Sequence, residues 1–397
     1  MIDVGRRRPL LVVGPALAGT GFGRVTAGLL PALSRRRVVC QLAPDCPSDI
    51  VGLSWPVYGN PTPLDPFATT RLTELVRSME PVVLALHGLT VIPRYLAALG
   101  QPRAIPFVAY CPIEGSLSSP TFVDWAAQVD HFVVYNAFAR SAVLRALDRP
   151  TTCRQPEIAV IPHGVDTDCF TPIDRRLARA DACRLIGKSI EPDAFIVLNV
   201  SKNEPRKRLD ITIEAFARFA RDAPPNVYLW LHTEPRAPGH NIFAAARAAG
   251  IETRLLVTTT TGGQPALSDA QLNRIYNACD VGLNTAMGEA WGLASFEHAA
   301  TGAPQVLPAI GAATELWHDA ALLIPAHQPA RVGSVFIGGA VAPDAVAQAL
   351  DRLYSDSDYR AAMGRAALRN AHNPRYRWSA IADQWDALIA DVDSAAP

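Results

Sequence analysis

The chain has 397 residues, of which 49% are hydrophobic and 19% charged, and its 37 basic side chains balance 37 acidic ones. At about 100–200 residues per domain, this length predicts two domains, each large enough for its own core. Zero net charge argues against nucleic acid or a strongly anionic membrane surface as the main partner, and it favours a small, locally recognised ligand. No apolar run approaches the roughly 20 residues that cross a bilayer, so no transmembrane segment is expected.

The seven cysteines are scattered singly, without a C-x-x-C pair. This pattern is typical of a reduced cytosol rather than of a disulfide framework, so we expect a cytoplasmic protein. Three arginines at 6–8 before the apolar stretch 9–18 resemble a secretory signal. Because Gly14 and Pro15 interrupt that stretch, we favour a first buried strand there.

Short apolar runs alternate with helical patterns along the whole chain, which predicts an α/β protein with parallel sheets covered by helices on both faces. Strands are expected over residues 10–14, 38–42, 82–87, 105–110, 131–135 and 158–161, then over 194–200, 227–232, 254–258, 280–284, 305–307 and 322–324. The turn-rich stretch 163–172 separates the two series. We therefore expect an N-terminal domain over 1–165, a linker over 166–182 and a C-terminal domain over 183–375. A final helix within 376–397, with apolar residues at helical spacing, is expected to pack back onto the first domain.

A first glycine cluster follows the first expected strand and ends in Gly21, Gly23 and Arg24. Glycines here would let the backbone approach a ligand, and the start of the next helix favours an anion. As a dinucleotide fingerprint the spacing is wrong, G-x-G-x-G instead of G-x-G-x-x-G, which counts against a nicotinamide-dependent oxidoreductase. A tight turn without a ligand is the alternative.

A second cluster, residues 199–208, holds Lys202 and Lys207, two of the three lysines among 37 basic residues. The arginine-rich composition makes this placement informative, because a compact ammonium reaches phosphate oxygens as a point charge. We therefore expect a phosphate contact from this loop. The alternative is a solvated basic loop.

A third cluster, residues 288–298, lies between an expected strand and a helix. Its glycine-flanked turn would present successive amides at a helix start, suited to phosphate or to sugar hydroxyls. Glu289 and Glu297 can face one cleft from this turn and helix. An acidic residue near a helix start is also ordinary dipole chemistry, so a structural role for Glu297 stays open.

These residues resemble a known family. Glu289-x7-Glu297, followed by His-Ala-Ala-Thr-Gly-Ala-Pro, is similar to the E-x7-E donor motif of retaining GT-B glycosyltransferases of the family 4 type. Lys202 and Lys207 resemble the family's R-x4-K pair, with lysine in the first place. The glycine loop, the junction 161–170, the stretch 314–316 and the tryptophan-bearing final helix follow in the family's order, so the resemblance covers nearly the whole chain.

The resemblance implies two Rossmann-like domains facing a cleft, with a GDP- or UDP-sugar bound mainly by the C-terminal half. It implies that Glu289 contacts the donor sugar, Glu297 the ribose diol and the two lysines the diphosphate, so that transfer proceeds with retention and without a metal or cofactor. The turn at 258–263 lies where the base usually stacks. The full donor set expected is Gly21, Gly23, Arg24, Lys202, Lys207, Thr258, Glu289, Ala290, Trp291, Gly292, Leu293, Ala294 and Glu297.

One feature departs from the family. Its members often carry a histidine after the fourth strand, where this chain reads Ala-Tyr-Cys-Pro-Ile-Glu-Gly at 109–115. His87, Glu114 and Tyr110 are the candidate substitutes near the reacting sugar, although a lone histidine at a strand end is often structural. The expected catalytic residues are thus Lys202, Lys207 and Glu289, with His87 and Glu114 as weaker candidates.

The sequence favours a glycosyltransferase acting on an unidentified acceptor hydroxyl. A sugar-nucleotide epimerase or hydrolase of the same fold would share the donor site, and an inactive donor-binding protein would bind without turnover. Three D-x-D triplets, at 166–168, 356–358 and 391–393, are interpreted as structural because none follows a strand in a nucleotide-binding half, so no metal site is expected. Base, sugar, acceptor and oligomeric state are not indicated.

Overall fold

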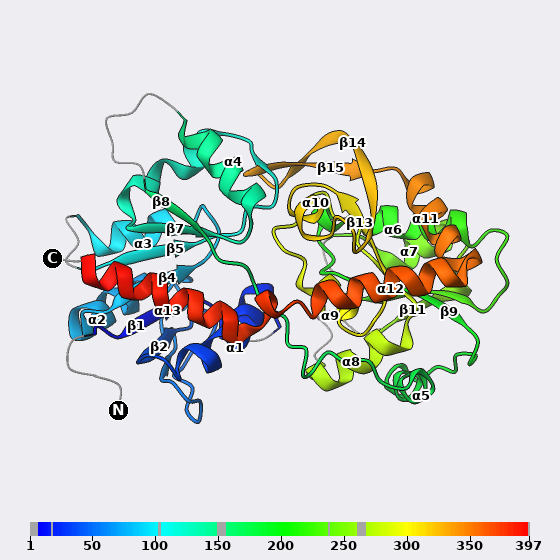
Figure 1. The fold of residues 1–397 in the computed structure, drawn as a ribbon, viewed down its shortest axis with the longest axis horizontal. Coiled ribbons are helices and arrows are strands. Elements are labelled where there is room, and N and C mark those ends of the chain that lie inside the picture. Colours follow the sequence, from blue (N-terminus) through cyan, green and yellow to red (C-terminus); the bar gives the residue numbers. More distant parts are fainter. Residues whose placement is uncertain are drawn as a thin grey trace. The chain divides into compact units, whose positions relative to one another are not determined.

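A computed structural model of the chain describes residues 7–16, 19–101, 105–148, 156–236, 239–259 and 267–395. The chain divides into two compact units (Figure 1). Unit 1 comprises Met1–Ile113, Leu117–Gly164 and Pro374–Pro397, and unit 2 comprises Glu114–Ser116 and Val165–Asn373.

Within the described residues of unit 1, seven strands form a sheet in the order β3-β2-β1-β4-β5-β7-β8, and its neighbouring strands pair in parallel. The central strands are short apolar runs whose residues are all buried, as expected where helices cover both faces. The strands are β1 (Leu10–Val13), β2 (Val39–Leu42), β3 (Val57–Tyr58), β4 (Val82–Leu86), β5 (Phe107–Tyr110), β7 (His131–Val134) and β8 (Glu157–Val160). The helices are α1 (Gly21–Leu33), α2 (Thr69–Met79), α3 (Ile92–Leu99), η1 (Pro120–Gln128), α4 (Ala137–Leu147), η4 (Pro374–Tyr376) and α13 (Trp378–Ala395).

The C-terminal helix α13 belongs to unit 1 and packs against α1, so the expected return of the chain to the first domain is confirmed. Glycine makes the close approach possible, because a Cβ atom on Gly28 would lie 2.2 Å from Cε2 of Trp378. Arg36 and Arg37 pair with Asp383 and Asp386 of α13, each at 2.7 Å.

Within the described residues of unit 2, eight strands follow the order β11-β10-β9-β12-β13-β14-β15-β6. The pairs from β11 to β14 are parallel, whereas β14 and β15 are antiparallel. The strands are β6 (Ser116–Leu117), β9 (Phe195–Val200), β10 (Val227–His232), β11 (Leu255–Val257), β12 (Val281–Leu283), β13 (Gln305–Ala309), β14 (Leu322–Val332) and β15 (Phe336–Val341). The helices are α5 (Arg175–Ile186), η2 (Pro205–Lys207), α6 (Leu209–Phe219), α7 (Ile242–Ala248), η3 (Glu252–Arg254), α8 (Asp269–Ala278), α9 (Leu293–Ala299), α10 (Ala312–Leu316), α11 (Pro343–Ser355) and α12 (Ser357–Ala371).

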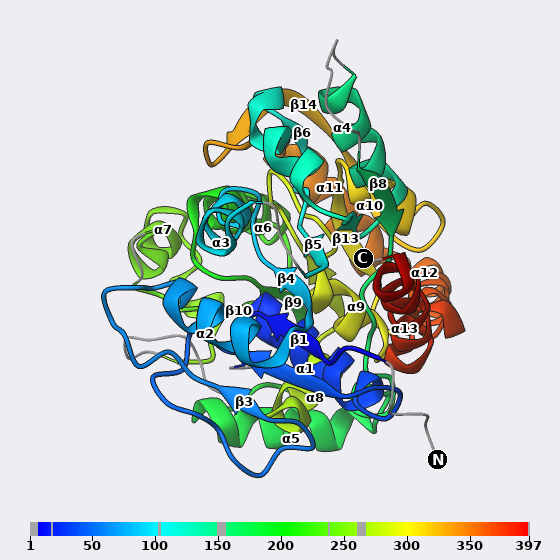
Figure 2. The same ribbon diagram turned by 90° about the vertical axis from the view of Figure 1, so that its left-hand side faces the viewer.

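The expected α/β class is confirmed, and each of the twelve predicted strands corresponds to a strand in the structure. The short strands β3 and β6, the strand β15 and the extension of β14 to Val332 were not predicted. The expected linker is partly helical, because α5 begins within it and packs beside α8 in unit 2 (Figures 1 and 2). Buried Arg179 of α5 binds Asp280 Oδ2 at 3.0 Å, which anchors that helix.

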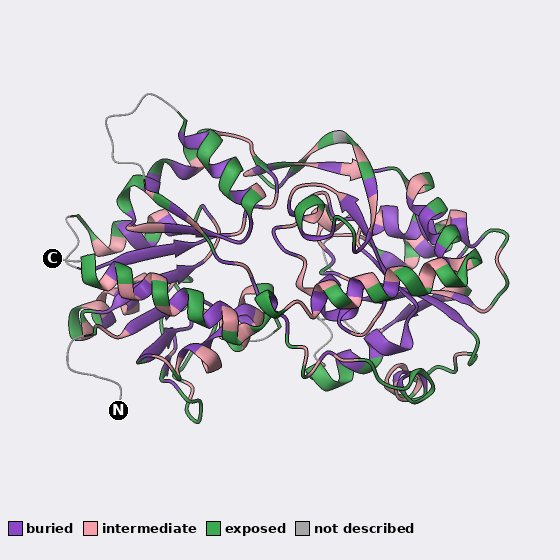
Figure 3. Cartoon of the chain, viewed as in Figure 1, coloured by how far each residue is buried: buried purple, intermediate pink, exposed green. Residues whose placement is uncertain are grey.

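Burial follows these elements. The strands of both sheets are mostly buried, whereas the helices present exposed residues on their outer faces (Figure 3). No helix in the described part of the chain is long and apolar enough to span a membrane. Among the described residues, Cys40, Cys46, Cys111, Cys183 and Cys279 are free thiols, and Cys153 lies outside the described residues.

Candidate functional site

The lysine loop and the E-x7-E turn meet in unit 2. The lysine loop follows β9, and the turn carrying Glu289 follows β12. Since β9 and β12 are adjacent parallel strands, the segments after them leave the same edge of the sheet. The structure thus brings together two motifs that lie about 80 residues apart in the sequence.

Lys207 and Glu289 form an ion pair at this edge: the Lys207 ammonium donates to Oε2 of Glu289. Burial alone would raise the pKa of Glu289. Lys207, Arg206 and a hydrogen bond from Asn284 outweigh that effect and hold the pKa below its usual value. Glu289 is therefore an ionised hydrogen-bond acceptor at neutral pH, the form that suits sugar hydroxyls.

Arg206, next to Lys207, is a residue that the sequence did not single out. Its guanidinium lies 3.3 Å from Oε1 of Glu114 and 3.2 Å from Oε2 of Glu204, and Nη1 donates to the Gly288 carbonyl at 3.2 Å. Burial alone would lower the pKa of Arg206, but the surrounding carboxylates raise it. A half-buried arginine among acidic residues leaves no periodic signal in a sequence.

Glu114 reaches this cluster from a distant part of the chain. Residues Glu114–Ser116 belong to unit 2, although their neighbours on both sides belong to unit 1. Glu114 lies two residues before Ser116, the first residue of β6 at the edge of the second sheet. Burial raises the pKa of Glu114, Arg206 lowers it and Glu289 raises it, with a net increase. The weaker catalytic candidate Glu114 therefore lies beside the expected donor residues.

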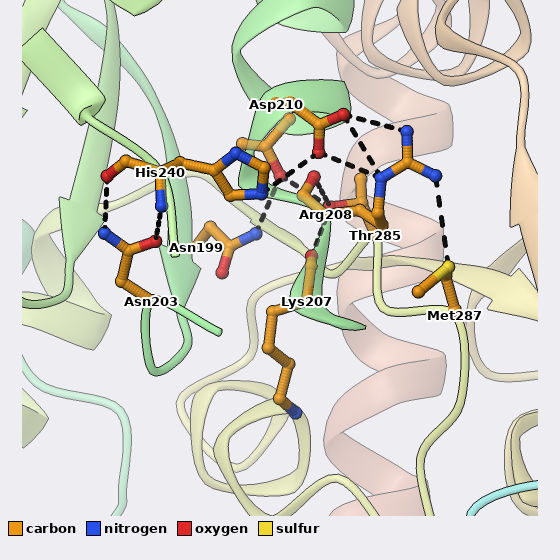
Figure 4. A network of polar contacts seen from close by, with 9 residues as sticks. Asn199, Asn203, Lys207, Arg208, Asp210, His240, Thr285 and Met287 are labelled. Atoms are coloured by element: carbon orange, nitrogen blue, oxygen red, sulfur yellow. Dashed lines mark hydrogen bonds and ion pairs between the residues drawn. The ribbon is translucent and has the colours of Figure 1, made fainter. Parts of the chain in front are cut away.

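A buried network of two threonine hydroxyls and one asparagine amide is hydrogen-bonded to the backbone carbonyl of Lys207 (Figure 4). The hydroxyl of Thr285 lies 3.1 Å from the Lys207 carbonyl and 2.9 Å from that of Arg208, and it contacts the Thr212 hydroxyl at 2.7 Å. The side-chain amide of Asn199 donates to Thr212 at 2.9 Å. This network connects β9, α6 and the segment after β12, so it fixes the point from which Lys207 extends.

Arg208 adopts a left-handed conformation, with φ 50°, that is unusual for a residue with a side chain. Its guanidinium binds Asp210 through both carboxylate oxygens, and Nη1 lies 4.0 Å from Sδ of Met287 (Figure 4). Asp210 also faces His240, whose Nε2 lies 3.5 Å away. These contacts hold the strained turn that leads from the lysine loop into α6.

Lys202 differs from Lys207 in its surroundings. It is exposed, and among the residues that the structure describes its ammonium has no ion-pair partner. Asn203, the next residue, is buried and bridges the backbone of Glu234 and His240 with bonds of 2.7–3.0 Å. The loop is thus anchored while the Lys202 charge remains available to a ligand.

Glu297, the second glutamate of the motif, is only 6% exposed. The hydroxyl of Tyr276 on α8 donates to its Oε2 at 2.9 Å. The neighbouring His298 stacks on the Tyr276 ring, with 5.1 Å between centroids, and burial lowers the pKa of His298 to about 3. The carboxylate is therefore held by its own neighbours in one orientation.

A small pocket, partly open to solvent, lies beside Glu289. Trp291 stacks on Phe296 at 5.1 Å, and Phe296 in turn contacts Trp317, which gives the pocket an aromatic wall. Gly292 precedes α9 with φ 90°, and no side chain caps that helix. The predicted residues Ala290, Leu293 and Ala294 continue the same turn, with Ala290 buried.

Thr258 lies in unit 2 at the end of β11, where its hydroxyl contacts Trp230 Nε1 at 3.1 Å and His232 Nδ1 at 3.0 Å. These bonds indicate a role in joining β10 and β11. Most of the predicted base-binding turn at 258–263 falls outside the described residues.

The remaining candidates lie in unit 1. His87 is half-buried between the rings of Phe22 and Phe67; its Nδ1 accepts from the Gly88 amide at 2.8 Å, and burial lowers its pKa to about 4. Gly21, Gly23 and Arg24 form the first turn of α1.

The Gly23 amide and the hydroxyl of Tyr110, another candidate from the sequence, are already hydrogen-bonded within unit 1. The Gly23 amide donates to Oγ1 of the capping residue Thr20 at 3.0 Å. Tyr110 is buried and bonds the Ile161 carbonyl and His163, so it serves the core of unit 1. Neither the Gly23 amide nor the Tyr110 hydroxyl can bind an anion unless it first gives up its present hydrogen bond.

Two of the D-x-D triplets act as caps or turns. Asp166 accepts from the amides of Asp168 and Cys169, and Asp356 caps α12 by accepting from the Tyr359 amide. Within the described ranges, no three His, Cys, Asp or Glu side chains gather as a potential metal-ligand group.

Two Rossmann-like units in one chain, with motif residues at a sheet edge of the second, define the class as the GT-B fold. Sucrose-phosphate synthase from Thermosynechococcus elongatus has a TM-score of 0.77 and 17% identity, covering 98% of this chain and 100% of its own. HepE from Anabaena has a TM-score of 0.70 and 15% identity, covering 97% and 100%. At these identities the likeness establishes the fold.

Residues 194–356 match the family model described as Glycosyl transferases group 1. The resemblance inferred from the motifs is therefore confirmed. A D-inositol 3-phosphate glycosyltransferase from Segniliparus rotundus is 29% identical over 242 residues, which cover 60% of this chain and 47% of the relative. The chain thus spans about half the length of the curated relatives it matches.

Proposed function

We propose that this protein transfers a sugar from a nucleotide donor, a GDP- or UDP-sugar, to an acceptor hydroxyl with retention of configuration and without a metal. The observation that carries the proposal is the Lys207–Glu289 ion pair beside the aromatic pocket, with buried Glu297 eight residues further on. All three residues lie within the stretch that matches the family model of the group 1 glycosyl transferases.

The chemistry assigned to these residues follows from their charge. Transfer breaks the bond between the anomeric carbon and a diphosphate oxygen, and negative charge develops on the leaving diphosphate. Exposed Lys202 and the paired Lys207 would stabilise that charge. Without a ligand, the Lys207 ammonium donates to Glu289. With the donor bound, the lysine can turn to the diphosphate while the Glu289 carboxylate accepts from sugar hydroxyls.

The nucleoside part of the donor would be held deeper in unit 2. Glu297, whose carboxylate is oriented by Tyr276, would accept both hydroxyls of a ribose. The amides of Leu293 and Ala294, at the start of α9 where no side chain caps the helix, would donate to phosphate or sugar. In these roles positive side chains and amides replace a divalent cation.

The names of similar proteins suggest which substrates to test first. Curated relatives are named D-inositol 3-phosphate glycosyltransferase, and the solved structure of HepE holds UDP and glucose. UDP-glucose, UDP-N-acetylglucosamine and GDP-mannose are therefore the first donors to test, with an inositol phosphate as the first acceptor. The cysteines, scattered along the sequence without a C-x-x-C pair, support our proposal of a cytoplasmic location.

The test measures donor turnover with and without acceptor, in EDTA. An α-linked product from an α-linked donor in EDTA supports retention and metal independence. Release of free nucleotide without acceptor would identify a hydrolase, and rearrangement of the donor an epimerase. Donor binding without turnover of any kind would identify an inactive donor-binding protein. Absence of both binding and turnover would refute the proposal.

A further inference from the structure

Arg206 connects three parts of unit 2 beside the pocket: the segment containing Glu114, the lysine loop with Glu204, and the turn before Glu289. We propose that Arg206 is a positioning residue for the donor sugar, which together with Glu114 fixes the turn at Gly288 and thereby aims Glu289. The inference rests on the proposed function, because it assigns the sugar contact to Glu289.

The turn is held through its backbone from both sides. The Met287 amide donates to the Arg206 carbonyl at 2.8 Å, and the Met287 carbonyl accepts from the Gly339 amide at 2.9 Å. The Arg206 guanidinium then donates to the next carbonyl, that of Gly288, at 3.2 Å. Main chain and side chain of one arginine thus bind two consecutive residues immediately before Glu289.

Glu114 closes the arrangement. A Cβ atom on Gly288 would lie only 2.3 Å from the Glu114 carbonyl, so the backbone of the incoming segment rests directly on the turn. The Glu114 carboxylate lies 3.3 Å from Arg206 Nη2, and both side chains are largely shielded, at 21% and 25% exposure. The Glu114 segment therefore packs against the turn at Gly288, and its carboxylate orients Arg206, which donates to that turn.

An arginine suits this position better than a lysine. The guanidinium uses Nε, Nη1 and Nη2 toward three separate oxygens, an arrangement that a planar fork provides and a single ammonium does not. Arg206 also lies among the carboxylates of Glu114, Glu204 and Glu289, whose mutual repulsion it offsets. Arg206→Lys keeps the positive charge but loses the planar guanidinium, whereas Arg206→Met loses both, so these two substitutions separate the effect of geometry from that of charge.

The expected consequence is specific to the sugar. Lys207 binds the Glu289 carboxylate itself, whereas Arg206 acts on the backbone that carries Glu289. Glu297, assigned to the ribose, is held by Tyr276, which is not among the residues that Arg206 binds. Loss of Arg206 should therefore weaken binding of a nucleotide-sugar more than binding of the nucleoside diphosphate alone.

Calorimetry on the full chain tests this with two matched pairs of ligands, UDP with UDP-glucose and GDP with GDP-mannose. The quantity compared is the Kd of the nucleotide-sugar divided by that of the diphosphate. In Arg206→Met this ratio should rise about ten- to a hundredfold, while the Kd of the diphosphate changes by less than about threefold. Arg206→Lys should raise the ratio too, and Glu114→Gln should raise it by a smaller factor.

Arg218→Met is the matched control. Arg218 also pairs with two carboxylates, those of Glu214 and Asp344, but on the α6 and α11 surface. Its ratio should equal that of the wild type. Thermal midpoints show whether each variant is folded, and if Arg206→Met does not fold, Arg206→Lys and Glu114→Gln provide the test.

Three outcomes would overturn the inference while leaving the proposed function intact: an unchanged ratio, an equal loss of both affinities, or a wild-type ratio in Arg206→Lys. A wild type that binds none of the four ligands would instead refute the proposed function, and this inference with it.

Discussion

The hydroxyl of Tyr276 on α8 donates a hydrogen bond of 2.9 Å to Oε2 of Glu297 on α9. Both residues are buried, at 0% and 6% exposure, so the carboxylate is oriented before any ligand arrives. A group that is ordered in advance loses little conformational entropy on binding. The pair therefore gives a direct test of the ribose contact assigned to Glu297.

Glu297→Ala should weaken the binding of UDP or GDP by about tenfold or more, because a charged hydrogen-bond acceptor is lost. Tyr276→Phe keeps the carboxylate but frees it to rotate, and should weaken binding by a smaller factor. Calorimetric Kd values check both changes. Unchanged affinity in Glu297→Ala would assign this residue to the structure of unit 2 instead.

Lys207→Ala should lower kcat by on the order of 10²–10³, as losing one strong charge stabiliser often does. Lys202→Ala should lower kcat less, since this exposed side chain has no described ion-pair partner to order it. Initial rates at saturating donor measure both effects. Near wild-type turnover in Lys207→Ala would remove this residue from the diphosphate site.

Thr285→Val removes the hydroxyl that bonds the carbonyls of Lys207 and Arg208, with little change in volume. It should lower the free energy of unfolding by about 1–3 kcal/mol, because these carbonyls and the Thr212 hydroxyl lose a partner. Turnover should fall as well, since Lys207 is no longer held. Thr285→Ser retains the hydroxyl and should restore both quantities; denaturant titration and initial rates provide the comparison.

Stability should fall as pH decreases from about 6.5, because burial lowers the pKa of His163 and of His298 to about 3 in the folded chain. Unfolded histidines bind protons near pH 6.5, so protons are taken up on unfolding between that pH and about 3. Folding stability therefore rises with pH across this window and levels off above it. His298→Asn should reduce the slope of unfolding free energy against pH, measured by denaturant titration from pH 4 to 8; an unchanged slope would contradict the assignment.

Gly28→Ala should destabilise unit 1 by about 1–3 kcal/mol, since the added methyl would overlap the indole of Trp378 and α13 would have to move. Gly19→Ala is the control, because no atom lies within 4 Å of a Cβ atom placed there. Thermal unfolding compares the two variants. Equal midpoints would show that α13 adapts without cost.

The strands were predictable because each is a short apolar run buried on both faces, a pattern visible without knowledge of strand order. The motif residues Lys207, Glu289 and Glu297 were predicted from the rare lysines, the glycine-flanked turn and the E-x7-E resemblance, in segments that come after two of these strands. Their roles in binding and catalysis remain predictions. The split into two units at 164 and 165 lies within one residue of the predicted end of the first domain, whereas α5 within the expected linker was missed because its apolar face is narrow.

The contacts of Arg206 could not be predicted from local patterns. They depend on Glu114, more than 90 residues earlier, which joins unit 2 through a two-residue strand and close approaches at glycines. Such approaches are set by backbone packing between distant segments, for which one sequence holds no periodic signal. The same reason hid β6.

The passage of Glu114–Ser116 into unit 2 bears on how the chain can be divided. A fragment spanning Val165–Asn373 would look like an intact Rossmann-like domain but would lack its outermost strand. The edge of β15 would then present unpaired amides and carbonyls, which invite pairing between copies. Such a fragment would be prone to self-association and would carry an Arg206 deprived of one of its carboxylate partners.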